Sequence, residues 1–459
     1  MTHAPARRRL ARAAAVLAAT AVAAGAALPA AEARPPKGDT ARVSETAKGE
    51  QLNGDSVALG LSEDGRSALF ASTATNLLPE PGTPNSDEVY VRDLRNGHVE
   101  KVSVADDGSR LNAPTREASI SADGRYVAFT TSATNVVPGQ VARAGDVFVR
   151  DRWTGRTEPV TPGGSADGGA FSAEPSLSRD GRYVAYVSNR TDLAPGSNPR
   201  YFNVLVTDRW TGTTRVVTAG ADGEAANNSS YGVTISADGS TVGFSSRAGN
   251  LLPQDPPTTT EPEDGTDAGT PGLARPRFYP YFVWKADTGK VSGASVDDRG
   301  SLRGTSLGPR LSPDGRYALF GLPVRVGRPG SNRFRMDLYA RELATGHLTW
   351  LNAFLPGTTT TEGAHYPAMT FDGRWVYFDS SADNLVPGDT NGVSDIFRRD
   401  LRTGAIERVS LTRDGGQSTT GSTAPFVDVA GDTVLFTAGD GNLVPGDTNA
   451  AADVFLRRP

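Results

Sequence analysis

Two stretches of the chain carry acidic and amide side chains at one shared spacing. NLVPGDTNGVSDIF begins at Asn384, and NLVPGDTNAAADVF begins 58 residues later at Asn442. The side chains concerned are Asp389, Asn391 and Asp395 in the first stretch, and Asp447, Asn449 and Asp453 in the second. Hard cations such as Ca²⁺ prefer such oxygen ligands in a tight loop. Asp and Asn also cap turns by accepting hydrogen bonds from backbone N–H groups. The pattern therefore predicts either two calcium loops or two capped turns.

A second group of polar side chains precedes a series of Asp-Gly turns and differs from one turn to the next. Its members are Arg116 and Glu117, Glu174, Tyr231, and His365 with Tyr366. A rim that mixes these residue types can bind a sugar or a peptide, or it can simply be hydrated. Two carboxylates can also cleave a glycosidic bond by acid–base chemistry. Glu117 and Glu174 therefore keep open the alternative of a glycosidase or polysaccharide lyase.

No convincing catalytic set accompanies these side chains. Beyond the first residues of the chain, the histidines are His98, His347 and His365, and two of them directly follow a turn glycine. There is no cysteine, so a thiol nucleophile and thiolate metal sites are excluded. We therefore expect a protein that binds rather than catalyses.

The elements that must position these groups are repeats. Ser-x-Asp-Gly-Arg, followed by an alternating strand that ends on an aromatic residue, appears for example as SADGRYVAF (Ser121–Phe129). The seven copies of this unit end at Phe70, Phe129, Tyr186, Phe244, Phe320, Phe378 and Phe436. Asp-Gly and Thr-Gly pairs supply hairpin turns between four short strands in each repeat. Such sheets bury both faces when they pack radially as the blades of a propeller.

The two ends of the chain predict how the ring closes. The seventh unit stops at DVFLRRP (Asp453–Pro459), after its third strand. ARVS (Ala41–Ser44) resembles the missing fourth strand and stands alone near the other end. The sequence thus predicts an all-β, seven-bladed β-propeller of four-stranded antiparallel blades over residues 40–459, with the N-terminal strand completing the last blade. Residues 34–39 would be a short linker.

The repeat also resembles a known group of propellers. Ser312–Arg316 reads SPDGR, the signature of the TolB-like propellers built from WD40-like (PD40) repeats, and five other copies match it in part. The resemblance covers nearly the whole chain after its first 33 residues and implies the propeller fold. TolB itself carries an N-terminal α/β domain and serves an envelope complex with a lipoprotein. Only a few residues precede the first strand here, so that role is not carried over.

Residues 1–33 have the composition of a signal peptide. Four arginines precede an apolar run over Ala13–Leu28, and Ala31–Ala33 offers a small-x-small cleavage site. The run is short and rich in alanine for a membrane anchor. We expect a secreted protein, exported by either the Sec or the twin-arginine route. The net charge of −5 is mild, which argues against a nucleic-acid partner.

Long connections should gather on one face of the propeller, where loops on a rigid scaffold carry function. Residues 251–280 form an acidic, Pro- and Thr-rich insertion in the fourth unit, expected as a flap that is either a tolerated insertion or a partner-binding arm. We expect a monomer without a membrane span that binds a protein, a peptide or a cell-wall glycan through this face. Calcium is the one candidate cofactor.

Overall fold

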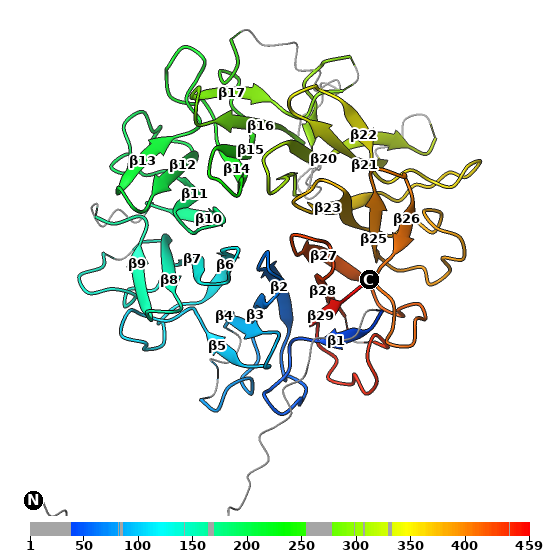
Figure 1. Cartoon of the computed structure of the whole chain (residues 1–459). Coiled ribbons are helices and arrows are strands. Elements are labelled where there is room, and N and C mark those ends of the chain that lie inside the picture. The colour runs from blue at the N-terminus through cyan, green and yellow to red at the C-terminus, as the bar shows by residue number, and fades with distance from the viewer. Residues whose placement is uncertain are drawn as a thin grey trace, which may run out of the picture. The chain divides into compact units, whose positions relative to one another are not determined.

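The computed structural model describes residues 38–80, 82, 86–141, 143–163, 169–253, 278–297, 299–305, 308–328, 333–439 and 441–459, and of Arg116 the backbone alone. Within these residues every regular element is a β-strand, and the strands form seven antiparallel sheets around one centre (Figure 1). The predicted seven-bladed propeller is confirmed. The predicted signal peptide, and residues 254–277 of the insertion, lie outside the described residues.

Each sheet is a blade whose strands follow one another from the centre outward. Blades 1 and 2 consist of β2 (Ser56–Leu61), β3 (Ser67–Ser72), β4 (Glu88–Asp93) and β5 (Val99–Lys101), and of β6 (Thr115–Ile120), β7 (Tyr126–Thr131), β8 (Asp146–Asp151) and β9 (Arg156–Pro159). Blades 3 and 4 consist of β10 (Ser172–Leu177), β11 (Tyr183–Ser188), β12 (Asn203–Asp208) and β13 (Thr213–Val216), and of β14 (Ser230–Ile235), β15 (Thr241–Ser246), β16 (Tyr279–Lys285) and β17 (Lys290–Gly293).

The remaining blades follow the same order. Blade 5 consists of β19 (Arg310–Leu311), β20 (Tyr317–Val326), β21 (Arg333–Glu342) and β22 (Leu348–Trp350), and blade 6 of β23 (Ala364–Met369), β24 (Trp375–Ser380), β25 (Asp395–Asp400) and β26 (Ile406–Arg408). Blade 7 consists of β27 (Ser422–Val427), β28 (Val434–Ala438), β29 (Asp453–Arg457) and β1 (Thr40–Arg42).

Blade 4 differs from the prediction at its insertion. A short strand, β18 (Gly304–Thr305), pairs with the start of β16, so that sheet has five strands. Tyr279 and Pro280 belong to β16, and Leu251 is buried, so both ends of the predicted insertion are part of the fold.

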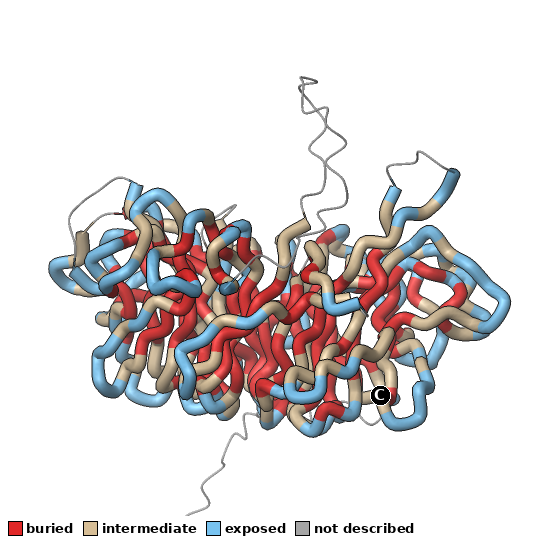
Figure 2. Tube along the Cα trace, turned by 90° about the horizontal axis from the view of Figure 1, so that it is seen from above, coloured by how far each residue is buried: buried red, intermediate tan, exposed pale blue. Residues whose placement is uncertain are grey.

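The core lies between the blades and is built from the second and third strands of each. The aromatic residue that ends each repeated motif stacks in most blades on an aromatic residue of the next strand, as Phe70 does on Tyr90 with ring centroids 5.8 Å apart. Burial is concentrated in the strands, and the exposed residues lie in the connections on the two faces (Figure 2). The second strands are buried on both sheet faces, as β3 is along its whole length, and so they carry nearly continuous runs of apolar and small residues.

The Ser-x-Asp-Gly-Arg motif builds the turn between the first and second strands. In blade 5 the Ser312 hydroxyl donates to Asp314 Oδ1 over 2.6 Å and accepts the N–H of Tyr317 over 2.8 Å. Gly315 adopts φ +67°, which a residue with a side chain rarely does. These turns and the Thr-Gly turns make up one face of the ring, named here the short-turn face. The opposite long-loop face carries the other connections.

Neighbouring blades are joined by backbone hydrogen bonds at the second residue of this motif. The N–H of Ala122 donates to the carbonyl of Arg179 (2.9 Å), whose own N–H donates to Ala237 in the next blade (2.8 Å). The series continues from Ala237 to Pro313, and from Phe371 through Val429 to Glu63. Since proline has no N–H, the bond from blade 5 to blade 6 is missing from it. A nearly complete ring of inter-blade bonds therefore encircles the centre at the short-turn face.

The predicted closure of the ring is confirmed. β1 pairs antiparallel with β29, with Ala41 opposite Leu456, and the strand begins at Thr40, one residue earlier than expected. The Arg42 guanidinium contacts Asp447 Oδ1 at 2.6 Å and Asp453 Oδ2 at 3.3 Å, and all three side chains are buried. β1 thus adds a buried ion pair to the strand pairing that closes blade 7.

Closure should depend on the Arg42 guanidinium. Replacing it in an Arg42→Met variant leaves two buried carboxylates without their cation, which typically costs about 3–5 kcal/mol in the free energy of unfolding. Urea unfolding monitored by tryptophan fluorescence measures the loss. Arg413→Met removes the more exposed ion pair with Asp39 (3.2 Å) beside the same closure, and this control should cost less than about 1 kcal/mol. Equal losses in the two variants would contradict the assigned role of Arg42.

Acid should weaken the blades through two carboxylates on the short-turn face. The Arg125 guanidinium binds Asp151 through two hydrogen bonds (3.0 and 2.7 Å) and lowers the pKa of that carboxyl to about 2. Arg182 does the same to Asp208, whose pKa is also about 2. A carboxyl whose pKa is lower in the folded chain stabilises the fold above its ordinary pKa of about 4. That contribution is lost as the pH falls toward 2.

An Asp151→Asn, Asp208→Asn double variant tests this dependence. We expect it to be less stable than the parent protein at pH 5 and to approach the parent as the pH falls from about 4 to about 2. Urea unfolding at a series of pH values gives the difference. A difference that stays constant across the series would show that the two pairs do not stabilise the fold through their charge.

Candidate binding site in the central channel

The innermost strands of all seven blades line one cavity at the centre of the ring. Its volume is about 240 Å³. One position of this wall differs between the blades, namely the residue two places before the first residue of each motif turn. Five blades have a small side chain there, and blades 5 and 7 have a large one. The small residues are Gly60, Ser119, Ser176, Thr234 and Ala368, and the large ones are Arg310 and Phe426.

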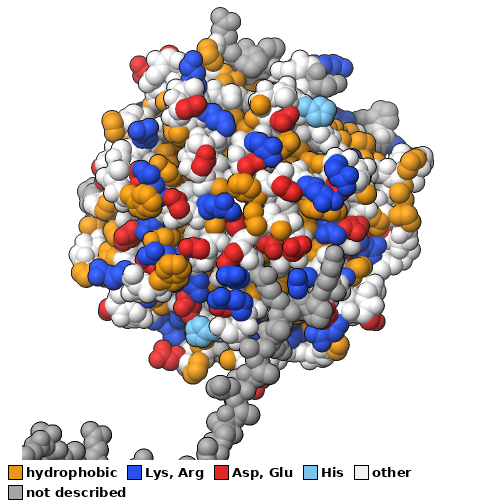
Figure 3. Space-filling model, viewed as in Figure 1, with side chains coloured by type: hydrophobic (Ala, Val, Ile, Leu, Met, Phe, Trp, Pro, Cys, Tyr) orange, Lys and Arg blue, Asp and Glu red, His pale blue; other side chains and the backbone are white. Residues whose placement is uncertain are grey.

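The short-turn end of the channel is closed by side chains of the same residues that form the inter-blade ring. Glu63 of blade 1 and Arg179 of blade 3 form an ion pair (Oε2 to Nη2, 2.5 Å). The Arg179 guanidinium also lies over the ring of Phe371 from blade 6, 4.8 Å from its centroid. Figure 3 shows this face, where Lys and Arg side chains are interspersed with Asp and Glu. A ligand would therefore enter the channel from the long-loop face.

Arg310 is the unusual group in this channel. Burial lowers the pKa of its guanidinium from the ordinary arginine value. It lies over the ring of Phe426, 4.9 Å from the centroid, and so reaches from blade 5 toward blade 7. Among the described residues it has no hydrogen-bond acceptor and no carboxylate partner. Arg310 is half-buried, and a guanidinium in such a site is stabilised by an anionic partner, so this geometry suits a carboxylate-bearing ligand.

The structure brings the two predicted rim carboxylates into one inter-blade chain. Glu117 Oε2 accepts the N–H of Glu174 (2.9 Å), and Glu174 Oε2 accepts the N–H of Gly232 (2.6 Å). Glu174 has φ +54°, a strained value that presents its N–H to the neighbouring blade. Burial raises the pKa of Glu174, as does the charge of Glu117, and the backbone N–H groups oppose this rise. Both carboxylates thus hold blades together as well as facing the channel mouth.

The other predicted rim residues lie at equivalent positions in other blades. His365 Nδ1 lies 3.6 Å from Asp379 Oδ1, and Asp379 Oδ2 accepts the N–H of Ala424 in the next blade (3.0 Å). Tyr366 has φ +49° and adds to the electrostatic environment of Arg310. The side chain of Tyr231 does not join them in one described cluster. Tyr231 packs on Phe202, with ring centroids 5.8 Å apart, and only the backbone of Arg116 is described.

The enzymatic alternative gains no further group from the described residues. Glu117 and Glu174 remain the paired carboxylates, and each already accepts a backbone hydrogen bond. The sequence also holds a Gly-x-Ser-x-Gly match, GTSLG at 304–308, whose serine lies outside the described residues. A nucleophile elbow joins a strand to a helix, whereas this stretch leads from β18 to β19.

The first Asp/Asn loop is built around an arginine. Arg408, at the end of β26, contacts Asp389 Oδ1 at 2.8 Å and Asp395 Oδ2 at 3.6 Å. The Asn391 amide donates to Asp395 Oδ2 (2.8 Å) and to the carbonyl of Ser418 (3.0 Å). All of the predicted ligand side chains in this loop therefore converge, and a guanidinium lies where they meet.

The second loop repeats the arrangement with a residue from the other end of the chain. Arg42 takes the place of Arg408 beside Asp447 and Asp453, and Asn449 donates to Asp453 Oδ2 (3.2 Å). No cluster of three or more acidic, histidine or cysteine side chains suited to a metal ion occurs within the part of the chain that is described. The capped turn is the interpretation that these contacts favour, and calcium binding stays a prediction.

Sequence reasoning missed Arg310, Phe426 and Asp379. The signal for the first two was present, because they are the only large residues at an inner-strand position that is otherwise Gly, Ser, Thr or Ala. Asp379 lies on a second strand, and nothing in its sequence context predicts that it faces His365 across the sheet.

A calcium titration separates the two interpretations of the Asp/Asn loops. We expect excess calcium chloride and EDTA to give the same melting temperature, because Arg42 and Arg408 already contact both carboxylates of each loop. An Arg408→Met variant removes one guanidinium and should gain a calcium-dependent rise in melting temperature, since two carboxylates and an amide oxygen are then left together. A calcium-dependent rise in the unmodified protein would instead establish the loops as calcium sites.

Comparisons with known proteins give matches among solved structures. No protein-family model matches the chain, and no curated protein is similar to it in sequence. The β-propeller domain of the Trilobed protease from Pyrococcus furiosus is 11% identical, with a TM-score of 0.49 over 88% of this chain and 95% of that one. TolB from Acinetobacter baumannii is 15% identical, with a TM-score of 0.35 over 82% and 77% of the two chains. An acylaminoacyl peptidase from Pyrococcus horikoshii is 11% identical, with a TM-score of 0.46, and this chain covers 49% of it. The matched structures are thus a propeller domain of a protease, a TolB and a peptidase.

Proposed function

We propose that the chain is a secreted, non-catalytic propeller that binds a carboxylate-bearing segment of a partner protein or peptide in its central channel. The observation that carries this proposal is the half-buried Arg310 guanidinium, which lies in the channel wall over the ring of Phe426 without an anion among the described residues. The ligand would supply that anion and enter from the long-loop face, because Glu63, Arg179 and Phe371 close the other end.

The dimensions of the site favour an extended segment over a folded surface. The cavity of about 240 Å³ accommodates a few side chains or a short stretch of backbone. Phe426 offers an apolar wall next to Arg310, and the mouth above offers Tyr366 and His365. A peptide with one acidic side chain would thus contact a charge, an aromatic face and a polar rim.

Secretion rests on residues 1–33, whose basic and apolar regions have the order of an export signal. Among the described residues, no helix has the length and apolar character needed to cross a bilayer. A mild net charge of −5 with interspersed signs also favours a specific partner over nucleic acid.

Binding of acidic peptides tests the proposal. The probe is a library of fluorescein-labelled hexapeptides that carry one Asp or Glu, each matched by its Asn or Gln analogue. We expect acidic members to bind more tightly than their amide analogues, and Arg310→Gln to weaken them by roughly tenfold to hundredfold, as for the loss of a charge-assisted hydrogen bond. Fluorescence polarisation measures the affinities.

Arg299→Gln is the matched control, because Arg299 is exposed on the connection between blades 4 and 5. It should bind the peptides as the parent protein does. Equal affinity for acidic and amide peptides, or full affinity in Arg310→Gln, would overturn the proposal.

A further inference from the structure

A groove between blades 3 and 4 departs from its two preceding equivalents. On the short-turn face, the residue after the third strand donates its N–H to the motif turn of the same blade. This residue is Arg152 in blade 2, Arg209 in blade 3 and Ala286 in blade 4, with N–H to carbonyl distances of 2.9, 2.9 and 2.8 Å. Blades 2 and 3 thus have a long cationic side chain at this position, and blade 4 has only a methyl group.

The arginines fill the grooves that precede them. Arg209 binds Glu158 of the preceding blade (2.9 and 2.6 Å), donates to the carbonyl of Gly181 and lies 4.6 Å from the centroid of the Tyr126 ring. Arg152 likewise binds Glu100 and the carbonyl of Gly124. In these two grooves, an internal cation therefore meets an internal anion.

The groove between blades 3 and 4 lacks that cation and reverses the charge opposite it. Arg215 stands at the strand register of Glu158, since Val206 pairs with Arg215 as Val149 pairs with Glu158. Arg215 is exposed, and its guanidinium forms no hydrogen bond or ion pair with any described residue. With Ala286 opposite, a pocket of about 370 Å³ is left open.

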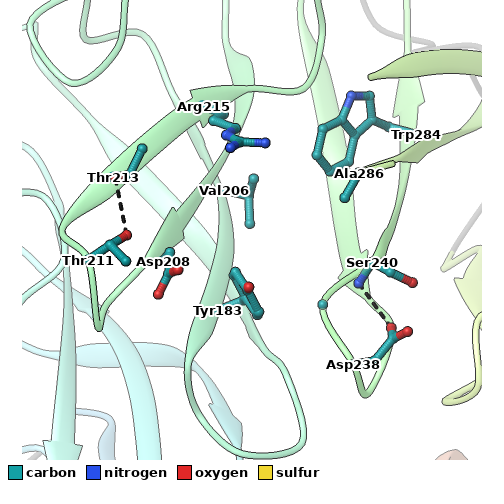
Figure 4. Close-up of a pocket in the computed structure, with 11 residues that line it drawn as sticks. Tyr183, Val206, Asp208, Thr211, Thr213, Arg215, Asp238, Ser240, Trp284 and Ala286 are labelled. Carbon is teal, nitrogen blue, oxygen red and sulfur yellow. Dashed lines mark hydrogen bonds between the residues drawn. The ribbon is translucent and has the colours of Figure 1, made fainter. Parts of the chain in front are cut away.

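Figure 4 shows how this pocket is lined. The guanidinium of Arg215 is directed across the groove toward Trp284, and Val206 and Tyr183 lie below it on the same wall. Ser240 and Asp238 form the opposite wall. Thr211, Thr213 and Asp208 complete the polar lining.

We infer that this pocket binds a monosaccharide-sized acidic sugar, a hexuronic acid. Arg215 supplies the partner of a carboxylate. Asp208 and Asp238 can accept hydrogen bonds from ring hydroxyls, while the threonine and serine hydroxyls can donate to them. Tyr183, Val206 and Trp284 form the apolar surface that a sugar ring needs on one side. Asp208 already accepts hydrogen bonds from Arg182, and Asp238 from the N–H of Ser240, so the ring hydroxyls would donate to the acceptor sites that remain. An aromatic acid without hydroxyl groups would place carbon against these sites.

Calorimetric titration with methyl β-D-glucuronide tests the inference, with methyl β-D-glucoside and benzoate as comparison probes. We expect the glucuronide to bind at least about tenfold more tightly than either one. Arg215→Gln should reduce the glucuronide to the affinity of the glucoside. Ala286→Arg, which recreates the filled groove of blade 3, should abolish binding of all three probes.

Thermal unfolding first establishes that both variants fold, and Arg299→Gln serves as a control that should bind as the parent protein does. Equal binding of glucuronide and glucoside, or unchanged affinity in Arg215→Gln, would overturn the assignment of the carboxylate contact. If benzoate bound as tightly as the glucuronide, the assignment of a sugar as the ligand would be wrong. Since the groove lies outside the channel, either result leaves the role of Arg310 to its own experiment.

Discussion

The ring of backbone hydrogen bonds at the short-turn face is the interaction on which the rest of the structure depends. A four-stranded sheet leaves the edge of its inner strand unpaired, and exposed edges invite association with other chains. Here the second residue of most motif turns presents a donor to one neighbouring blade and an acceptor to the other, as Arg179 does. The donor of blade 7 finds its acceptor only when that blade lies beside blade 1. The same inter-blade bonds therefore favour closure of the ring by β1 and set the position of the inner strands that line the channel.

The second residue of the motif therefore has two roles: its backbone joins the blades, and its side chain shapes the end of the channel. The backbone of Arg179 joins two blades, while its side chain extends over the channel end and meets Glu63 and Phe371. Since the backbone is held, a change of side chain there alters the channel without disturbing the ring. At the rim of the channel, side chains join the blades instead. The carboxylates of Glu117 and Glu174 accept hydrogen bonds from backbone N–H groups of the neighbouring blade.

The fold could be predicted from the sequence because each repeat contains recognisable turn residues and a recognisable strand pattern. Seven copies of one motif, and a third strand without a fourth at the end of the chain, leave little choice of architecture. The Asp/Asn loops show where that reasoning stops. Their side chains do converge, yet the cation among them is Arg408 in one blade and Arg42, from the far end of the sequence, in the other. Predicting which arginine lies beside each pair of carboxylates requires the register of the paired strands. The spacing of residues along the sequence does not give that register.

The candidate sites lie where one repeat departs from the others. Most inner-strand positions facing the channel are small, and Arg310 is the exception that brings a charge. Ala286 and Arg215 are likewise exceptions to a pattern of arginine and glutamate in the two preceding grooves. A scaffold residue is under the same physical demand in every blade, so its type tends to recur. A residue that departs from its equivalents and places a cation without an anion on a wall has no role that the repeat requires. Ligand binding is the function that would account for such a residue.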